Sequence, residues 1–328
     1  MKNILISLII LFNLFGCNSI KKIEKEKFLF GTFIKITVFS ENKTLAENSV
    51  KKAFDEITRV QDEYNPYKKG SKFYNLNHNS GKYIKVSNEE IMMLKDAIKM
   101  SELTNGKYDI TIAPIMKLWN FKEEKAKALP NQKKLKEKLN LVDYKKIKID
   151  NNFVKIGKNQ EIDTGSFLKG YAIYRAREIL KKNGIKSAFI SAISSIEVIG
   201  EKPNNKKWKI GIQNPENKEK ILKILEVSNV SIGVSGDYQT YKIINGKKYH
   251  HLIDATTGYP ARENKMVVIL AKNSYIADLY STALFPLKKE KILKIVNFNK
   301  DLEAMIVDKN MNISYSSNFE NYISKEKK

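Results

Sequence analysis

The feature that most constrains the fold of this chain is the order of its strand-like and helix-like segments. These segments do not follow a regular β-α-β alternation. Residues 28–39 alternate around a glycine and β-branched residues, which predicts a strand. A capping box at Ser87 and Glu90 predicts the start of a helix that Asn105-Gly106 ends. An earlier helix is predicted by an apolar stripe at helical spacing, formed by Ala46, Val50, Phe54, Ile57 and Val60.

The second half of the chain again mixes both kinds of segment. Residues 153–162 predict a strand that runs into Asp163, and residues 171–182 predict a helix. Asn245-Gly246 predicts a two-residue hairpin turn between two strands. The pattern then predicts a strand over 266–271, a helix over 275–284 and further short strands.

This mixture predicts an α+β fold, with a largely antiparallel or mixed sheet and packed helices, and argues against a doubly wound nucleotide-binding fold. At 42% apolar residues the chain can bury one large domain or two closely packed halves. It has one cysteine, so no disulfide can form within it and the core alone must hold the domain.

The first residues are typical of a targeting segment. Lys2 precedes an apolar run over 4–15 that is too short to span a bilayer comfortably. Its end, Leu14-Phe15-Gly16-Cys17, resembles the lipobox of bacterial lipoproteins. The alternative is a buried structural thiol beside a weak signal peptide.

The lipobox interpretation divides the chain into three parts. Residues 1–16 are expected to be a lipoprotein signal peptide, and residues 17–27 a lipidated Cys17 with a charged tether. Residues 28–328 are expected to form the folded domain. The protein is then expected to be a membrane-anchored lipoprotein that faces away from the cytoplasm.

The net charge of +23 raises the question of a nucleic-acid partner. Only four of the 59 basic residues are arginine, the residue favoured for reading base edges, and the lysines are spread along the chain with a concentration at 122–148. We therefore expect a solvated basic surface that lies against anionic lipid headgroups, and no nucleic acid.

A glycine-containing turn between a predicted strand and a predicted helix could bind phosphate. Its sequence is Asp163-Thr-Gly-Ser-Phe-Leu-Lys169-Gly170. Backbone N–H groups at a helix N-terminus and a lysine favour anions, although the order of residues is not that of a P-loop. An ordinary strand-to-helix turn is the alternative.

Two further sets of residues could carry chemistry. Asp278 and Thr282 are spaced to share one helix face and offer the hard oxygen ligands that suit Mg²⁺, although such pairs are more often solvated or capping. His250 and His251, on the second strand of the predicted hairpin, lie close in sequence to Asp254. An acid/base or phosphate-contacting role and a structural role remain open for these histidines.

Taken in order, these segments resemble the ApbE family, the FAD:protein FMN transferases, over nearly the whole mature chain. The resemblance also rests on Phe30-Gly31-Thr32, on Tyr67 with Ser71 to Asn77, and on Gly106 to Thr111. It continues through Pro114 to Trp119, Asp163 to Gly170, Ser235 to Tyr238, His251 to Gly258, and Ala277 to Phe285.

The resemblance implies a Mg²⁺-dependent transfer of FMN from FAD to a Thr or Ser hydroxyl of an acceptor protein, with release of AMP. Lys169 would offset negative charge, and His251 or Asp254 would accept the proton. Mg²⁺ would be held by Asp278, Thr282 and the backbone oxygen of Ser166, with Ser281 as a further candidate. The implied FAD contacts are Phe30, Tyr67, Tyr108, Asp109, Asp163, Lys169, His251 and Leu252.

Three departures from the family pattern limit what the resemblance implies. Phe30 replaces a methionine, Ala255 replaces a proline, and Ser194-Ser195 stands where many members have paired glycines. Serines there could reshape the contacts with the nucleotide, because glycines permit close backbone approach. Two other functions are weighed beside transfer: an FAD pyrophosphatase that yields FMN and AMP, and a non-catalytic flavin-binding lipoprotein.

Overall fold

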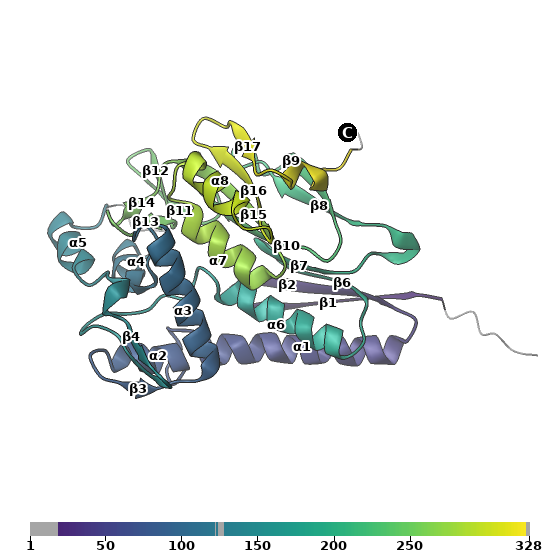
Figure 1. Cartoon of the computed structure of the whole chain (residues 1–328), viewed down its shortest axis with the longest axis horizontal. Coiled ribbons are helices and arrows are strands. Elements are labelled where there is room, and N and C mark those ends of the chain that lie inside the picture. Colours follow the sequence, from purple (N-terminus) through teal and green to yellow (C-terminus); the bar gives the residue numbers. More distant parts are fainter. Residues whose placement is uncertain (1–18, 122, 124–127, 326–328) are drawn as a thin grey trace, which may run out of the picture.

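An eight-stranded antiparallel sheet forms the centre of the molecule in this computed structural model, which describes residues 19–121, 123 and 128–325 (Figure 1). Each neighbouring pair of its strands runs antiparallel. Across the sheet the strands are β1 (Lys21–Leu29), β2 (Thr32–Ser40), β6 (Ser187–Ala192), β7 (Ser195–Ile199), β10 (Ser231–Gly236), β15 (Asn264–Ala271), β16 (Glu303–Asp308) and β17 (Ile313–Tyr315).

Helices pack on one face of this sheet and bury the larger apolar core. They are α1 (Lys43–Tyr64), α6 (Leu168–Lys182), α7 (Ser274–Leu284) and α8 (Lys289–Asn297). The opposite face carries a second apolar cluster under a two-stranded sheet of β8 (Trp208–Gln213) and β9 (Ile221–Val227). Both faces are therefore covered, which explains why alternation is lost in strands such as β15, where seven of eight residues are buried.

Shorter elements gather beside the start of α6 and the end of α7 (Figure 1). The helices among them are α2 (Lys72–His78), α3 (Asn88–Leu103), α4 (Ala113–Trp119) and α5 (Gln132–Leu139), with short 3₁₀ turns at Ile110–Ile112 and Tyr144–Lys146. The strands form a three-stranded sheet of β3 (Ile84–Lys85), β5 (Phe153–Lys155) and β4 (Lys148–Asp150), and two hairpins, β11 (Tyr241–Ile244) with β12 (Lys247–His250) and β13 (Ile253–Asp254) with β14 (Tyr259–Pro260). Two further 3₁₀ turns lie at Pro203–Asn205 and Phe319–Tyr322.

The expected α+β class with antiparallel sheet is confirmed. The predicted helices over α1, α3, α6 and α7, the strand β15 and the hairpin turn at Asn245-Gly246 are all present. The capping box of α3 is complete, since the Ser87 hydroxyl accepts from the Glu90 N–H and the Glu90 carboxylate accepts from the Ser87 N–H. Local signals of this kind succeed where propensity, cap and apolar stripe agree.

Several expected boundaries are wrong. The expected tether is wrong because residues 21–27 belong to β1, which pairs with β2 along its whole length, so the fold begins before Phe28. The strand expected over 28–39 is broken by a turn at Phe30-Gly31, where both residues have positive φ. The strand expected over 153–162 is regular for three residues only, and His251 follows β12 rather than belonging to it.

The lysines and glutamates of residues 21–27 are typical of a solvated linker. In the structure they belong to an edge strand, and their charged side chains face water. The signal peptide expected over 1–16 and the expected lipid site Cys17 lie outside the described residues. Among the residues the structure does describe, no helix is both long enough and apolar enough to cross a bilayer.

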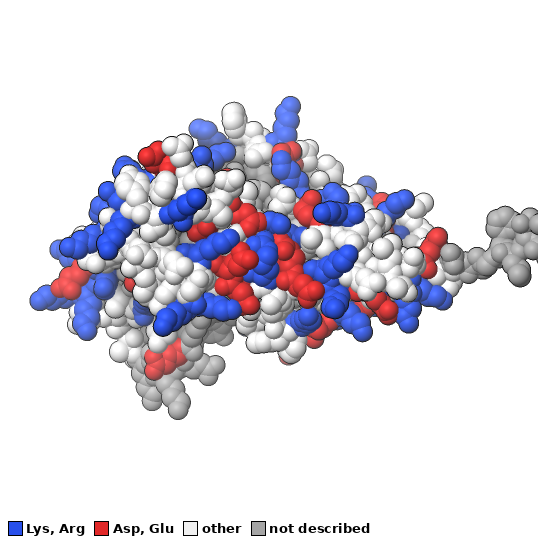
Figure 2. Space-filling view, turned by 90° about the horizontal axis from the view of Figure 1, so that it is seen from below, with Lys and Arg blue, Asp and Glu red and all other residues white. Residues whose placement is uncertain are grey.

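Ion pairs tie α1, α3 and α6 together on one side of the molecule. Arg59 donates to Glu56 at 2.8 Å and to Glu63 at 3.1 Å, while Arg175 pairs with Glu56 at 3.0 Å and with Glu89. Figure 2 shows this face, where acidic side chains lie among the basic ones instead of leaving a continuous basic stripe. On this face the charges of Arg59 and Arg175 are therefore compensated by neighbouring glutamates.

The position of α7 depends on two glycines that leave room for its backbone. A Cβ on Gly233 of β10 would lie 2.4 Å from the Ala277 carbonyl oxygen, and one on Gly170 of α6 would lie 2.7 Å from the Asp278 carboxylate. The Ser274 hydroxyl also donates to the Gly170 carbonyl at 2.7 Å. The helix therefore packs against the sheet and α6 more closely than side chains would allow.

We predict that Gly233→Ala lowers the free energy of unfolding by about 1–3 kcal/mol, because the added methyl group must push α7 away from β10. Chemical denaturation of the purified protein measures this. Gly211→Ala is the matched control, since its Cβ would meet only the side chain of Ile221. Equal stability losses in the two variants would contradict the assigned close packing.

Candidate functional site

One face of α7 gathers oxygen ligands. Asp278 and Ser281 are buried and Thr282 is half-buried. The hydroxyl of Ser235, on β10, lies 3.0 Å from the hydroxyls of both Ser281 and Thr282. The i, i+4 spacing of Asp278 and Thr282 predicted that they share one side of the helix, and Ser281 lies with them. The cluster is thus a carboxylate and three hydroxyls on two elements.

Asp278 is a buried carboxylate with a hydrogen bond from Ser195. The Ser195 hydroxyl donates to its Oδ2 atom at 2.5 Å. Burial raises the pKa of Asp278 to about 6, while the charge of Lys169 opposes that rise. A carboxylate whose charged form is disfavoured by burial gains most from a cation close by, so this group suits a divalent ion.

Lys169 lies in the first turn of α6, partly buried beside Asp278. Its ammonium donates to the Ser194 hydroxyl at 2.6 Å. Burial lowers the pKa of Lys169, and the charge of Asp278 works in the other direction. A lysine with few water contacts at a helix N-terminus is suited to contact phosphate oxygens.

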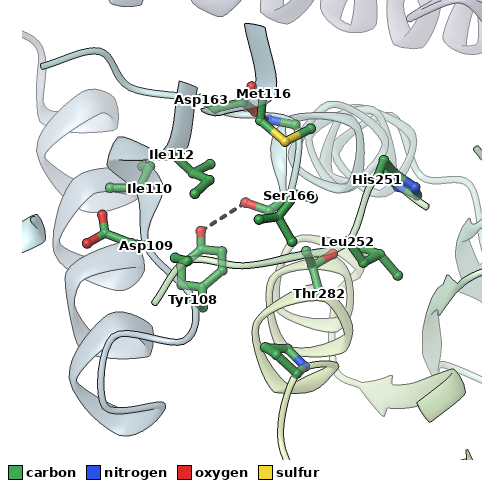
Figure 3. A pocket seen from close by; sticks show the side chains of 14 residues that line it. Tyr108, Asp109, Ile110, Ile112, Met116, Asp163, Ser166, His251, Leu252 and Thr282 are labelled. Atoms are coloured by element: carbon green, nitrogen blue, oxygen red, sulfur yellow. Dashed lines mark hydrogen bonds between the residues drawn. The ribbon is translucent and has the colours of Figure 1, made fainter. Parts of the chain in front are cut away.

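The turn before α6 presents Asp163 and Ser166. The Asp163 carboxylate accepts from the Tyr67 hydroxyl at 2.6 Å and from the Gly165 N–H at 2.6 Å. The hydroxyl of Ser166 lies 2.9 Å from that of Tyr108 (Figure 3). These bonds fix the turn from two sides, one through the segment after α1 and one through the segment after α3.

A pocket of about 130 Å³ opens beside this turn (Figure 3). Ligand sites usually measure about 300–1,000 Å³, so this pocket fits part of a dinucleotide and not all of it. Seven of the predicted site residues line it: Tyr108, Asp109, Asp163, Ser166, His251, Leu252 and Thr282. Apolar side chains complete the lining, namely Ile110, Ile112, Met116, Ile253, Ala255 and Pro286.

His251 faces this pocket in its neutral form. Its Nδ1 atom lies 3.1 Å from the Thr240 carbonyl oxygen, which can only accept, so Nδ1 carries the proton. Burial is the main cause that lowers the pKa of His251, and the charge of Lys169 adds to it. The Nε2 atom therefore keeps a lone pair that can accept a proton or a hydrogen bond.

Asp254, the other expected proton acceptor, uses both carboxylate oxygens in hydrogen bonds, one to Lys107 after α3 and one within its own loop. Its Oδ2 atom accepts from Lys107 at 2.6 Å, and its Oδ1 atom accepts from the Thr256 N–H and hydroxyl at 3.0 and 2.5 Å. Asp254 does not line the pocket either. The geometry favours His251 over Asp254 for accepting a proton.

Asp109 lines the pocket, but its carboxylate turns away from the centre (Figure 3). Its Oδ1 atom accepts from the Thr111 N–H and hydroxyl, and its Oδ2 atom accepts from the Tyr144 N–H at 2.8 Å. Phe30 lies at the β1–β2 turn outside the pocket lining, with its N–H bonded to the Gln61 side chain. The Asp109 carboxylate therefore holds backbone in place, and the backbone of Phe30 is itself held by Gln61.

The oxygen cluster fits a hard cation bound with few protein ligands. Among the described residues, no three His, Cys, Asp or Glu side chains gather as a metal site. Mg²⁺, however, commonly takes one or two carboxylates and fills its other positions with water and substrate phosphate. Asp278 with the hydroxyls of Ser281 and Thr282 meets that requirement.

Sequence reasoning missed buried residues of the sheet that hydrogen bond to α7. Glu197 on β7 is fully buried and accepts from the Ser274 N–H and the Ser231 hydroxyl, both at 2.6 Å. Burial raises the pKa of Glu197 to about 7. Ser235 could have been found from its place in the family motif, whereas no sequence signal linked Glu197 or Ser195 to α7.

The comparisons agree with this fold. The ApbE family model matches residues 30–306. An FAD:protein FMN transferase of Vibrio cholerae is 27% identical over 334 residues, which covers 99% of this chain and 100% of that protein. An FAD:protein FMN transferase of Buchnera aphidicola is 29% identical over 94% of this chain and 93% of its own length.

Solved structures show the same architecture. The ApbE protein of Thermotoga maritima is 26% identical and aligns with a TM-score of 0.85, over 93% of this chain and all of that one. The flavin transferase ApbE of Vibrio cholerae aligns at 0.82 with 22% identity over the same shares, which shows the fold alone.

The fold and its site place the chain among enzymes built on one α+β domain. The chain belongs to the ApbE family. The expectation of an enzyme from this family is thereby confirmed.

His250 supplies a test of the buried loop beside the pocket. Its Nε2 atom bonds to the Ala261 carbonyl at 2.7 Å, and burial lowers its pKa from 6.5 to about 3. As the pH falls, His250 is protonated in the unfolded chain before it is protonated in the folded one. Its contribution to the free energy of unfolding is therefore complete above pH 6.5 and is lost as the pH falls toward 3. Between pH 6.5 and 5 this group should cost about 2 kcal/mol.

We predict that His250→Gln removes this loss, so that its unfolding free energy falls about 2 kcal/mol less than that of the wild type between pH 6.5 and 5. Urea denaturation of both proteins at the two pH values measures the difference, and comparing them cancels the other titrating groups. Parallel pH profiles would show that His250 does not titrate as assigned.

Proposed function

We propose that this protein is a Mg²⁺-dependent FAD:protein FMN transferase that modifies a Thr or Ser hydroxyl and releases AMP. The observation that carries the proposal is the placement of Thr282, Ser166 and His251 around one pocket, with Asp278 one turn from Thr282. The names of the relatives support the flavin chemistry. We propose in addition that the metal is Mg²⁺, that the acceptor group is a Thr or Ser hydroxyl and that the leaving group is AMP.

The pocket divides the substrate into two environments. Its apolar part, lined by Ile110, Ile112, Met116 and Leu252, suits the flat flavin ring. Its polar part, at Ser166 and Thr282, leads to the cluster on α7, where the pyrophosphate would lie against Lys169. Because the pocket is smaller than FAD, the adenosine end would extend beyond it.

The transfer forms one phosphorus–oxygen bond and breaks another. The acceptor hydroxyl oxygen bonds to the phosphorus of the FMN half, and the bond from that phosphorus to the bridging oxygen breaks, so that AMP leaves. The hydroxyl proton passes to Nε2 of His251, whose Nδ1–H is held by Thr240. Lys169 stabilises the negative charge that collects on the leaving phosphate.

The cation would be held by Asp278, with Thr282, Ser281 and the backbone oxygen of Ser166 as further ligands. When bound, Mg²⁺ neutralises charge on the pyrophosphate and aligns it. The protein's own contribution is positioning. Close packing on Gly170 and Gly233 fixes α7, and hydrogen bonds from Tyr67 and Tyr108 hold the turn before α6.

The family resemblance implies a short Asp/Ser-Gly-Ala-Thr/Ser target in the acceptor. We predict that the protein, incubated with FAD, Mg²⁺ and an acceptor carrying this target, adds the mass of FMN to the acceptor and releases one AMP for each modified hydroxyl. Intact-mass spectrometry and nucleotide chromatography measure both. Free FMN with an unmodified acceptor would instead establish a pyrophosphatase. Bound flavin without AMP would establish a binding protein.

The matched variant for this experiment is Asp278→Ala. Turnover should fall by roughly 10³-fold or more, since a bound cation contributes several kcal/mol to such a reaction. Asp301→Ala removes an exposed carboxylate that pairs with Lys272 and should leave turnover unchanged. Unchanged activity in Asp278→Ala would remove the metal assignment.

We further propose that Cys17 is lipid-modified and holds the enzyme at a membrane on the extracytoplasmic side. The sequence around Cys17 supports this, and the basic surface suits anionic headgroups.

We predict that Cys17→Ala moves the protein from the membrane fraction to the soluble fraction of cells. Mass spectrometry of the mature N-terminus is the second measurement, and an unmodified cysteine there would refute the proposal.

A further inference from the structure

A two-residue turn, Ile193-Ser194, joins β6 to β7 in an unfavourable backbone conformation. Ile193 has a φ of 60° and its side chain is 70% exposed, so packing of that side chain does not explain the conformation. A β-branched residue rarely adopts a positive φ. Where a two-residue hairpin turn needs a positive φ at its first position, glycine is favoured at that position. Backbone strain of this kind collects at functional sites.

The backbone around this turn is fixed by β10, which also carries Gly233 and Ser235. The Val234 N–H donates to the Ser194 carbonyl at 2.8 Å, and Ser195 pairs with Gly233. The turn is therefore held directly against the strand that packs under α7 and carries the Ser235 hydroxyl. Ser194 is partly buried and Ser195 is fully buried.

The two serines reach two different helices. Ser194 accepts from the Lys169 ammonium of α6 at 2.6 Å, and Ser195 donates to the Asp278 carboxylate of α7 at 2.5 Å. Lys169 and Asp278 act on each other through their charges. Each is hydrogen bonded to its own serine, and a glycine pair at this turn would supply neither hydroxyl.

We propose that Ser194 and Ser195 are positioning residues of the transfer site, with Ser194 orienting Lys169 toward the nucleotide and Ser195 orienting the Asp278 carboxylate toward the cation. This inference rests on the proposed function. A neutral partner for each charged group prevents the ammonium and the carboxylate from closing into a direct ion pair, which would withhold both from their ligands. The two serines thus act on different ligands from adjacent positions.

The test separates the two ligands. Mg²⁺ affinity is measured by calorimetric titration of the protein with Mg²⁺ alone, and FAD affinity by quenching of flavin fluorescence in the absence of Mg²⁺. Ser195→Ala should weaken Mg²⁺ binding by about tenfold and leave FAD affinity unchanged, since a hydrogen bond to a charged group contributes on this scale. Ser194→Ala should weaken FAD binding by about fivefold and leave Mg²⁺ affinity unchanged.

Ser194→Thr keeps the hydroxyl and should restore FAD affinity to within about twofold of the wild type. Circular dichroism and the melting temperature of each variant check folding, and the half-buried Ser194 keeps the test open if Ser195→Ala fails to fold. If the wild type binds both ligands and the alanine variants match it, or if both affinities fall together in each variant, the positioning roles are refuted. If the wild type binds neither ligand, the proposed function itself fails.

Discussion

The close contact of α7 with β10 and α6 is the constraint on which the site depends. Without a Cβ at Gly233 and Gly170, the backbone of α7 approaches both neighbours, and the Asp278 carboxylate is placed inside the protein instead of at its surface. Burial disfavours the charged form of that carboxylate and raises its pKa, so a cation beside it would stabilise the charge. The same contact brings Ser281 and Thr282 beside Ser235, so the geometry of the oxygen cluster follows from helix packing.

The site is assembled from segments far apart in the sequence, each held by a separate structural device. The turn before α6 is fixed by Tyr67 and Tyr108, which come from segments before and after α3. His251 follows β12 and is oriented by Thr240. A reaction that depends on alignment is well served by groups whose own partners restrict their rotation.

Local sequence signals predicted much of this structure. The capping box of α3, the hairpin turn at Asn245-Gly246 and the apolar stripe of α1 each depend on residues close in sequence. The family resemblance, and no local signal, named Thr282 and Ser166 together as candidate metal ligands, and the structure shows both in the lining of one pocket. Contacts across the fold could not be predicted from the sequence. Nothing in the sequence links Glu197 to the start of α7. Nothing in it distinguishes His251 from Asp254, whose carboxylate is bonded to Lys107 and Thr256.

The early start of the fold changes what an attachment near Cys17 would mean mechanically. Because β1 begins at Lys21, three residues separate the two positions, and even a fully extended chain gives about 15 Å of reach. A lipid anchor at that cysteine would be joined to the folded domain by only a few residues. The domain could then rotate about its attachment point but could not move far from the lipid surface.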